Sequence, residues 1–253
     1  ADWHLALGIN LLNPHLWLYT MRGARKRDFP PDIGYQQPHF AKWKSLSDRN
    51  ARLSQLLTRG TRVVDTLVIH PIETGWCVTT PLEPGAIDGF DKSFKSLVDG
   101  LLAEHIDFHF GDESLMAKYG NVANGKLMVG KCLYSVAVIA ETLTLRESTS
   151  RLLERFAKAG GKVLILNRKP SLVDGATGRS ALLRKALAGA AVVRLPRLAR
   201  AIRAITRVPV EVDGTNAANV LYHLRDLGHQ RLLFLANTSY DKSADVSVTI
   251  RTG

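Results

Sequence analysis

Residues 106–161 constrain the fold more strongly than any other part of this 253-residue chain. Within them, residues 135–140 (SVAVIA) form a nearly continuous apolar run. Such a run is typical of a strand buried on both faces, as in a parallel sheet. A helical pattern follows and ends at Gly160 and Gly161, before a second apolar run at residues 162–167 (KVLILN). Since parallel strands need a crossover of this length, the stretch predicts a right-handed strand–helix–strand unit.

The residues upstream continue the same alternation of strand and helix. Residues 62–72 (RVVDTLVIHPI) predict a buried strand that ends at Pro71. A polar loop with Gly75 and Pro84 is expected next, before a helix near residues 89–105 whose apolar side chains share one side. We therefore predict that residues 61–207 form an α/β domain with a flavodoxin-like, doubly wound parallel sheet.

The acidic side chains that are the best candidates for a catalytic site lie in and just after the strand predicted at residues 106–110 (IDFHF). The alternation of this strand places Asp107 and His109 on its outward face. A glycine is expected to end the strand, after which Asp112 can cap a helix and Glu113 can favour its positive end. Because these structural roles explain the acidic side chains, we expect no catalytic site here.

Residues 1–60 look least like an independent fold. An apolar and aromatic beginning leads into a polar segment whose prolines, at positions 30, 31 and 38, exclude a regular helix and predict a long loop. A helix is expected after this loop, with Ser47 or Asp48 as its N-cap. Leucines 53, 56 and 57 form its apolar stripe, and Gly60 ends it.

The character of the sequence changes after Pro209. Residues 210–214, 219–239 and 245–253 contain short apolar runs joined by polar turns, with Asp-Leu-Gly-His-Gln as a hairpin loop. These patterns predict an antiparallel β segment. Its length of roughly 45 residues is too short to close a β-sandwich, so we expect only the start of one.

Charge and hydropathy exclude some classes of partner. No apolar run approaches the roughly 18 residues of a membrane span, so we expect no membrane association. The net charge of +11 is spread along the chain. In its most basic part, residues 194–207, the apolar side chains recur at helical spacing, which indicates a helix with a solvated basic face. We therefore expect no nucleic-acid partner, although the charge keeps that alternative open.

Motifs for cofactors, metals and covalent catalysis are missing. The sequence contains neither of the two common glycine-rich phosphate-binding motifs, G-x-G-x-x-G and G-x-x-x-x-G-K-[ST], so we expect no cofactor. Cys77 and Cys132 lack the spacing of metal ligands, so we expect no metal. Both cysteines lack the second glycine of a nucleophile elbow. The buried strand at residues 135–140 is followed by Glu141, where a nucleophile would stand, so amidotransferase activity is not expected.

Several segments together resemble modular glycoside hydrolases, especially large α-L-rhamnosidase-like enzymes. The resemblance covers nearly the whole chain and is more specific for architecture than for the sugar cleaved. Its motifs are LGINLLNPHLWLYTMRGARKRDFPPDIGYQQPHF, SDRNARLSQLLTRG, VVDTLVIHPIETGWC, IDFHFGDESLM, GKLMVGKCLYSVAVIAE, LLERFAKAGGKV and NVLYHLRDLGHQRLLFLANTS.

The resemblance implies three domains. Residues 1–60 would be the end of a catalytic (β/α)8 barrel, and residues 61–207 a class I glutamine amidotransferase-like accessory domain. Residues 208–253 would begin a β-sandwich domain. On this reading the chain is a fragment of a longer protein. We expect residues 1–60 to expose apolar surface, in particular at Leu11, Leu12, Trp17 and Leu18.

The same resemblance implies carbohydrate as the substrate of the full-length enzyme and a periplasmic or secreted location. The loop at residues 20–40 would border the sugar, because barrel enzymes bind substrate on such loops. The residues that would contact it are Arg22, Arg25, Tyr35, Gln36 and His39. Glycoside hydrolysis needs two positioned carboxylates, which the missing barrel strands would carry, so we expect this chain alone to be inactive.

Two other functions remain open. The first is a non-catalytic α/β domain that serves in carbohydrate binding or in assembly of a homo-oligomer. The second is a basic nucleic-acid-binding protein. The sequence alone does not decide the sugar, the linkage or the oligomeric state.

Overall fold

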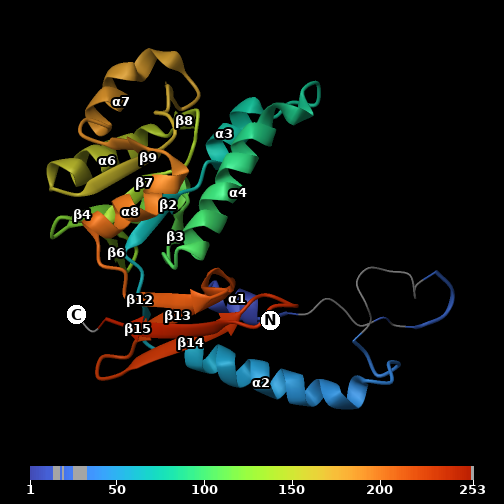
Figure 1. Cartoon of the computed structure of the whole chain (residues 1–253). Coiled ribbons are helices and arrows are strands. Elements are labelled where there is room, and N and C mark those ends of the chain that lie inside the picture. The colour runs from blue at the N-terminus through green and yellow to red at the C-terminus, as the bar shows by residue number, and fades with distance from the viewer. Residues whose placement is uncertain (14–17, 19, 25–32, 252–253) are drawn as a thin grey trace. The chain divides into compact units, whose positions relative to one another are not determined.

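The computed structural model describes residues 1–13, 18, 20–24 and 33–251. The chain divides into two compact units (Figure 1). Unit 1 comprises residues 1–63 and 219–244, and unit 2 comprises residues 64–218 and 245–253. Within the described ranges, no helix is long and apolar enough to cross a membrane.

Unit 2 is built on a five-stranded parallel sheet with the order β11-β9-β7-β2-β3. The central strand β7 and its neighbour β2 are buried on both faces, as the apolar runs predicted. The five strands are β2 (Thr66–Ile69), β3 (His109–Gly111), β7 (Val136–Ile139), β9 (Lys162–Leu166) and β11 (Ala191–Val193). The structure therefore confirms a mixed α/β fold with a parallel sheet.

Helices cover both faces of this sheet (Figure 1). One face packs on α4 (Asp88–Ala103) and α8 (Leu195–Ile205) in an apolar core that includes Leu97 and Leu198. The opposite face packs on three other helices through side chains such as Phe156. Those helices are α5 (Glu113–Tyr119), α6 (Glu147–Lys158) and α7 (Ser180–Ala186).

Smaller sheets complete unit 2. An antiparallel ribbon of β4 (Gly120–Ala123), β5 (Lys126–Val129) and β6 (Cys132–Tyr134) precedes the central strand β7. The short strands β8 (Thr144–Leu145) and β10 (Leu172–Val173) pair in parallel. Near the C-terminus, β12 (Val210–Thr215) and β15 (Asp245–Ile250) pair antiparallel, which agrees with the expected antiparallel segment. Short 3-10 helices, η2 (Pro84–Ile87), η3 (Thr177–Arg179) and η4 (Ala217–Asn219), occur in the loops.

In the residues of unit 1 that the structure describes, two α-helices accompany a three-stranded antiparallel sheet of order β1-β13-β14. The sheet brings residues 61–62 beside a hairpin from the C-terminal part of the chain. The buried ring of His223 on β13 lies 2.9 Å from the Leu5 carbonyl through Nδ1. The elements are α1 (Asp2–Ala6), α2 (Phe40–Thr58), β1 (Thr61–Arg62), β13 (Val220–Asp226) and β14 (Arg231–Asn237).

Helix α2 begins earlier than predicted. It starts at Phe40 with His39 as its N-cap, and neither Ser47 nor Asp48 caps it. Asp48 lies inside the helix and pairs with Lys44 one turn earlier, 2.6 Å apart. This pairing satisfies the carboxylate within the helix, so the preference of aspartate for caps did not mark the true start.

Two other predictions at segment level were wrong. The polar loop expected after Pro71 contains the helix α3 (Ile72–Val78), for which Pro71 is the N-cap residue. The carboxylate of Glu73 in its first turn favours the positive end of that helix. Strand β3 begins only at His109, and Phe110 is 51% exposed. The ring of Phe110 packs against His70, Phe94 and Phe108 at the edge of the sheet.

The apolar surface expected in residues 1–60 is present at one of the named positions. Leu11 is 83% exposed. Leu12 and Leu18 are half-buried, and Trp17 lies outside the described residues. The assignment of residues 1–60, 61–207 and 208–253 to a barrel, an accessory domain and a sandwich stays a prediction.

Candidate functional site at the carboxyl edge of the sheet

The loops that follow β2, β3 and β7 meet at one edge of unit 2. Parallel strands all end at the same edge, and ligands of open α/β sheets bind in the crevice outside those ends. Helix α3 follows β2, helix α5 follows β3, and residues 140–146 follow β7. The candidate site consists of polar side chains from these three segments.

Glu113 is the most buried carboxylate of this edge, with 1% of its surface exposed. Its Oε2 accepts a hydrogen bond from the Arg146 backbone N–H at 2.8 Å. The Oε1 atom is buried and has no hydrogen-bond partner in the part of the chain that the structure describes. Burial raises the pKa of Glu113, and the charge of Glu73 adds to this effect against the opposing Thr149 hydroxyl and Arg146. Burial therefore shifts the Glu113 carboxyl group towards its neutral form, and its hydrogen bond to Arg146 gives it a structural role.

Glu73 forms an ion pair with Arg146, the residue whose backbone N–H bonds to Glu113. Glu73 Oε1 accepts from Arg146 Nε at 2.7 Å and lies 2.6 Å from Arg146 Nη2. The Glu73 side chain is 16% exposed and that of Arg146 is 33% exposed, so water partly screens the pair. Together with Glu113, the pair joins the ends of all three segments.

The Glu73–Arg146 pair lines a cavity of about 390 Å³. Trp76 and Cys77 from α3 and the turn at Asp174 also line it. Asp174 adopts a left-handed conformation, with φ of 50°, and its carboxylate pairs with Arg179 at 2.9 Å. The lining is completed by Thr144, Leu145 and Gly175. We call this space the Trp76 cavity.

Three buried threonines fix the loop behind the Trp76 cavity. The hydroxyl oxygens of Thr74 and Thr142 lie 2.5 Å apart, and the Leu143 N–H donates to Thr74 Oγ1 at 2.9 Å. Thr142 donates to the Thr144 carbonyl at 3.0 Å, and Thr144 Oγ1 accepts from the Gly175 N–H at 3.0 Å. Since every link is a hydrogen bond between buried or half-buried groups, this network holds α3 and the loop after β7 in a defined position.

Glu141, the residue at the predicted nucleophile position, has a structural environment. Its Oε2 accepts from Ser93 Oγ and Asn167 Nδ2, both at 2.8 Å, and Arg168 Nε lies 3.0 Å from Oε1. Burial alone would raise the pKa of Glu141, but these hydrogen bonds and the Arg168 charge outweigh it and lower the pKa. Glu141 is therefore an ionised carboxylate that ties α4 to the loop after β9.

The acidic residues that the sequence brings close together, and the neighbouring His109, have separate structural roles. Asp112 caps α5 as predicted, with its Oδ1 accepting from the Leu115 N–H at 2.9 Å. Glu113 follows it in the first turn, as expected, but its burial exceeds what a helix-dipole role requires. Asp107 Oδ1 accepts from the Phe108 N–H, and His109 Nδ1 lies 2.9 Å from the buried Tyr134 hydroxyl.

The predicted sugar-contacting residues belong to unit 1. Tyr35 is 71% exposed, and Arg22 and His39 are also exposed. Gln36 is half-buried: its Nε2 donates to the Leu18 carbonyl at 3.1 Å, while its buried Oε1 lacks a partner among the described residues. Arg25 lies outside the described residues. Sugar contact by these five residues stays a prediction.

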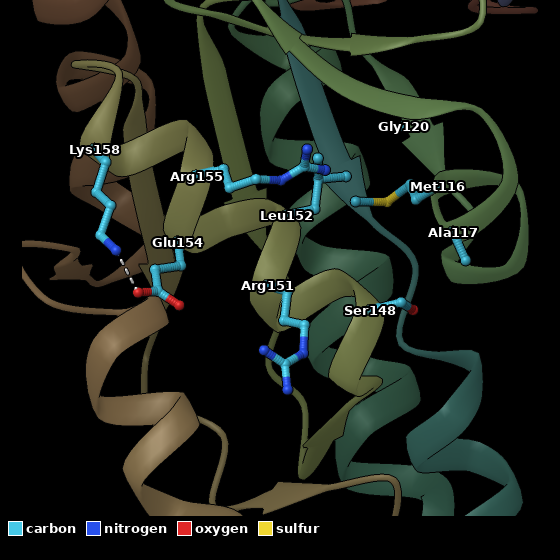
Figure 2. A pocket seen from close by; sticks show the side chains of 9 residues that line it. All are labelled: Met116, Ala117, Gly120, Ser148, Arg151, Leu152, Glu154, Arg155 and Lys158. Carbon is cyan, nitrogen blue, oxygen red and sulfur yellow. Dashed lines mark hydrogen bonds and ion pairs between the residues drawn. The ribbon is translucent and has the colours of Figure 1, made fainter.

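A second cavity, of about 430 Å³, lies between α5 and α6 in unit 2 (Figure 2). Arg151, Arg155 and Lys158 line it, which raises the question of anion binding. Each cation already has a partner, however. Lys158 pairs with Glu154, as the dashed line in Figure 2 shows, Arg151 pairs with Glu147, and Arg155 Nη1 lies 3.5 Å from Asn121 Oδ1. This charge compensation argues against a strong anion site.

Sequence reasoning missed the residues that form the Trp76 cavity. It placed Glu73, Trp76 and Cys77 in a polar loop, and it gave Arg146 no role. The pairing of β2 with β7 brings Glu73 close to Arg146, and the turn at Asp174 completes the lining, so no local spacing encodes these contacts. Both cysteines are free thiols, and no group of three potential metal ligands occurs in the described part of the chain.

Comparison with known proteins relates the chain to others by structure. No family model matches the sequence, and no curated protein matches it. The structure of a rhamnosidase from Novosphingobium sp. PP1Y matches 99% of this chain with a TM-score of 0.70 and 14% sequence identity. An apo exo-carrageenase GH42 from Bacteroides ovatus matches 83% with a TM-score of 0.46 and 11% identity.

The first likeness shows a shared fold. This chain shares the fold of the matched segment of that structure, at a distant level of sequence similarity. It spans 24% of the length of the rhamnosidase chain and 26% of the carrageenase chain.

Proposed function

We propose that this chain is the accessory part of a modular, α-L-rhamnosidase-like glycoside hydrolase and does not itself hydrolyse glycosides. The observation that carries the proposal is the match of 99% of this chain to a quarter-length segment, 24%, of a rhamnosidase chain. Because the match includes both compact units, it supports a shared order of domains, which a match to one common domain type would not.

The sheet topology supports the finer fold assignment in this proposal. Numbered along the chain, the strands β3-β2-β7-β9-β11 stand in the order 2-1-3-4-5. That order is the one found in flavodoxin-like doubly wound sheets. We therefore propose that residues 61–207 correspond to the class I glutamine amidotransferase-like domain of such enzymes, used as a scaffold.

The carboxylates of unit 2 support the non-hydrolytic part of the proposal. A glycosidase needs two carboxyl groups that both face the substrate. Glu113 is 1% exposed, and Glu141 accepts hydrogen bonds from Ser93 and Asn167. Glu73 is engaged by Arg146. These carboxyl groups have structural partners, so we assign hydrolysis to residues outside this chain.

In the proposed enzyme, residues 1–60 end the catalytic barrel and residues 208–253 begin a β-sandwich. The loop at residues 20–40 then borders the sugar, with Arg22, Arg25, Tyr35, Gln36 and His39 in contact with it. Its carbohydrate substrate, and a periplasmic or secreted location, belong to the same proposal.

The reading frame upstream of Ala1 and the activity of its product test this proposal. We expect a continuous frame that encodes barrel strands with acidic ends, and a full-length product that cleaves a panel of aryl glycosides. The 253-residue chain alone should show no cleavage. A start codon directly before Ala1, or hydrolysis by the chain alone that is lost in a Glu73→Gln variant, would contradict it.

The second candidate is a non-catalytic α/β protein for carbohydrate binding or homo-oligomer assembly, which the exposed Trp76 and Phe110 favour. It predicts function in the isolated chain without an upstream barrel. A nucleic-acid-binding protein is less favoured, because arginines such as Arg151, Arg179 and Arg251 form ion pairs with carboxylates. Binding to arbitrary DNA that weakens steeply with salt would support it.

A further inference from the structure

The Trp76 cavity combines an exposed aromatic ring with a charged pair that has unused hydrogen-bonding atoms. Trp76 is 65% exposed although it lines a cavity, and no aromatic ring packs on it among the described residues. Exposing a ring of this size to water is unfavourable by the usual area relation, roughly 25 cal/mol per Å². An exposed tryptophan beside a concave, polar surface is therefore a feature that points to a ligand.

The Glu73–Arg146 pair offers both an acceptor and a donor to such a ligand. Both contacts in the pair use Glu73 Oε1, and they use Arg146 Nε and Nη2. Glu73 Oε2 and Arg146 Nη1 have no hydrogen bond within the described residues. A carboxylate accepts and a guanidinium donates, so the pair can bind a hydroxyl group, which does both.

Charge balance identifies the class of ligand. Glu73 is neutralised by Arg146, and Asp174 by Arg179 at 2.9 Å. A charged ligand would disturb one of these pairs, whereas a neutral ligand with several hydroxyl groups would not. The cavity volume of about 390 Å³ lies in the range of small-molecule sites, roughly 300–1,000 Å³.

We propose that the Trp76 cavity binds a neutral sugar ring. One face of the ring stacks on the Trp76 indole, and its hydroxyl groups bond to Glu73 and Arg146. The buried threonine network at Thr74 and Thr142 keeps this surface in a fixed position, which lowers the entropy cost of binding. This inference rests on the chemistry of the cavity. It goes beyond the leading proposal, which assigns sugar contact to residues 20–40 of unit 1, and it gives the carbohydrate binding of the second candidate a specific site.

Saturation-transfer NMR on the whole chain tests the proposal, with L-rhamnose, D-galactose and D-glucose as probes and choline as a cationic competitor. We expect transfer from protein to the ring protons of at least one sugar, and about tenfold weaker binding in Trp76→Ala. Trp76→Phe should retain most of the binding. Tyr119→Ala removes an aromatic side chain that is 48% exposed and does not line this cavity, and it should bind like the parent.

Thermal unfolding of each variant shows whether lost binding reflects lost structure. The proposal is overturned by no transfer to any of the three sugars, or by unchanged transfer in a folded Trp76→Ala variant. Tight binding of choline that displaces the sugar would also overturn it, because it would identify a cation site instead. None of these outcomes depends on the upstream reading frame, so failure here is distinct from failure of the glycoside hydrolase proposal.

Discussion

Glu113 and Arg146 are linked by a 2.8 Å hydrogen bond from the Arg146 backbone N–H to Glu113 Oε2. The bond connects the start of α5 to Arg146, the N-cap residue of α6. It serves a backbone donor at a helix start, where such donors have no partner within the helix. A single buried carboxyl group therefore stabilises the junction on which the Trp76 cavity is built.

The burial of Glu113 predicts a specific pH dependence of stability. Burial raises the pKa of Glu113, so the folded state binds its proton more tightly than the unfolded state does. The free energy of unfolding should then fall as pH rises from the unfolded pKa, about 4.3, through the higher folded pKa. Glu113→Gln keeps an acceptor for Arg146 but cannot ionise, so it should remove this fall. Urea unfolding from about pH 4 to about pH 8 measures it.

A control variant separates the charge of Glu113 from its hydrogen bond. Glu113→Ala leaves the Arg146 N–H without its acceptor and creates a small cavity, so it should destabilise unit 2 by about 2–4 kcal/mol near pH 4. This cost should become smaller as pH rises, because the alanine variant does not share the Glu113-dependent fall in stability of the parent. If Glu113→Gln and the parent protein lose stability in parallel as pH rises, the pKa of Glu113 is the same in the folded and unfolded states, and our assignment is wrong.

Helix α5 should depend on the Asp112 cap. Asp112→Ala removes the 2.9 Å hydrogen bond to the Leu115 N–H, and loss of such a cap costs about 1 kcal/mol. Asp112→Asn preserves the acceptor oxygen and should cost clearly less. Chemical unfolding of the two variants beside the parent measures the difference. Equal destabilisation by alanine and asparagine would show that the negative charge at the helix start matters more than the cap.

The sequence predicted those parts of the fold that depend on local pattern. The apolar run at residues 135–140 predicted the central strand β7, and the residue types around Asp112 predicted a capped helix, because burial on two faces and capping both leave marks within a few residues. The antiparallel pairs near the C-terminus also followed from alternation and turn residues.

The sequence did not predict features that depend on contacts between distant segments. Helix α3 contains Thr74 and Gly75, which are weak helix formers, and its position is fixed by the bond between Thr74 and Thr142, 68 residues apart. Glu113 stands in the first turn of α5, where its position in the sequence predicts only an interaction with the helix dipole. Its burial depends on the packing of α6 against α5, which the local sequence does not show. The sequence did not predict the Trp76 cavity for the same reason, since its lining comes from three distant segments.

The contribution of Glu141 to the free energy of unfolding should depend on pH with the opposite sign to that of Glu113. Hydrogen bonds from Asn167 and Ser93 and the Arg168 charge overcome the effect of burial and lower the pKa of Glu141. Its stabilising effect should be complete above the unfolded pKa of about 4.3 and disappear as pH falls through the lower folded pKa. Glu141→Gln should therefore cost about 1–2 kcal/mol near neutral pH and much less in strong acid. Urea unfolding at the two pH values provides the test, and an equal cost at both would exclude a charge effect.

Gly60 should be indispensable to unit 1 for two physical reasons. It has φ of +62°, a left-handed conformation, and a Cβ atom there would lie 2.1 Å from the Asp226 carbonyl oxygen. Gly60→Ala must therefore accept backbone strain of about 1 kcal/mol and also displace β13, to which β1 pairs.

Gly228 provides the matched control within the same unit. It has φ of +89°, but a Cβ atom there would meet nothing within 4 Å. Gly228→Ala should cost only the strain, about 1 kcal/mol, whereas Gly60→Ala should cost at least about twice as much. Thermal unfolding monitored by circular dichroism compares the two. Similar losses of stability in both variants would mean that β13 moves aside at no cost, and that the turn between α2 and β1 does not anchor this sheet.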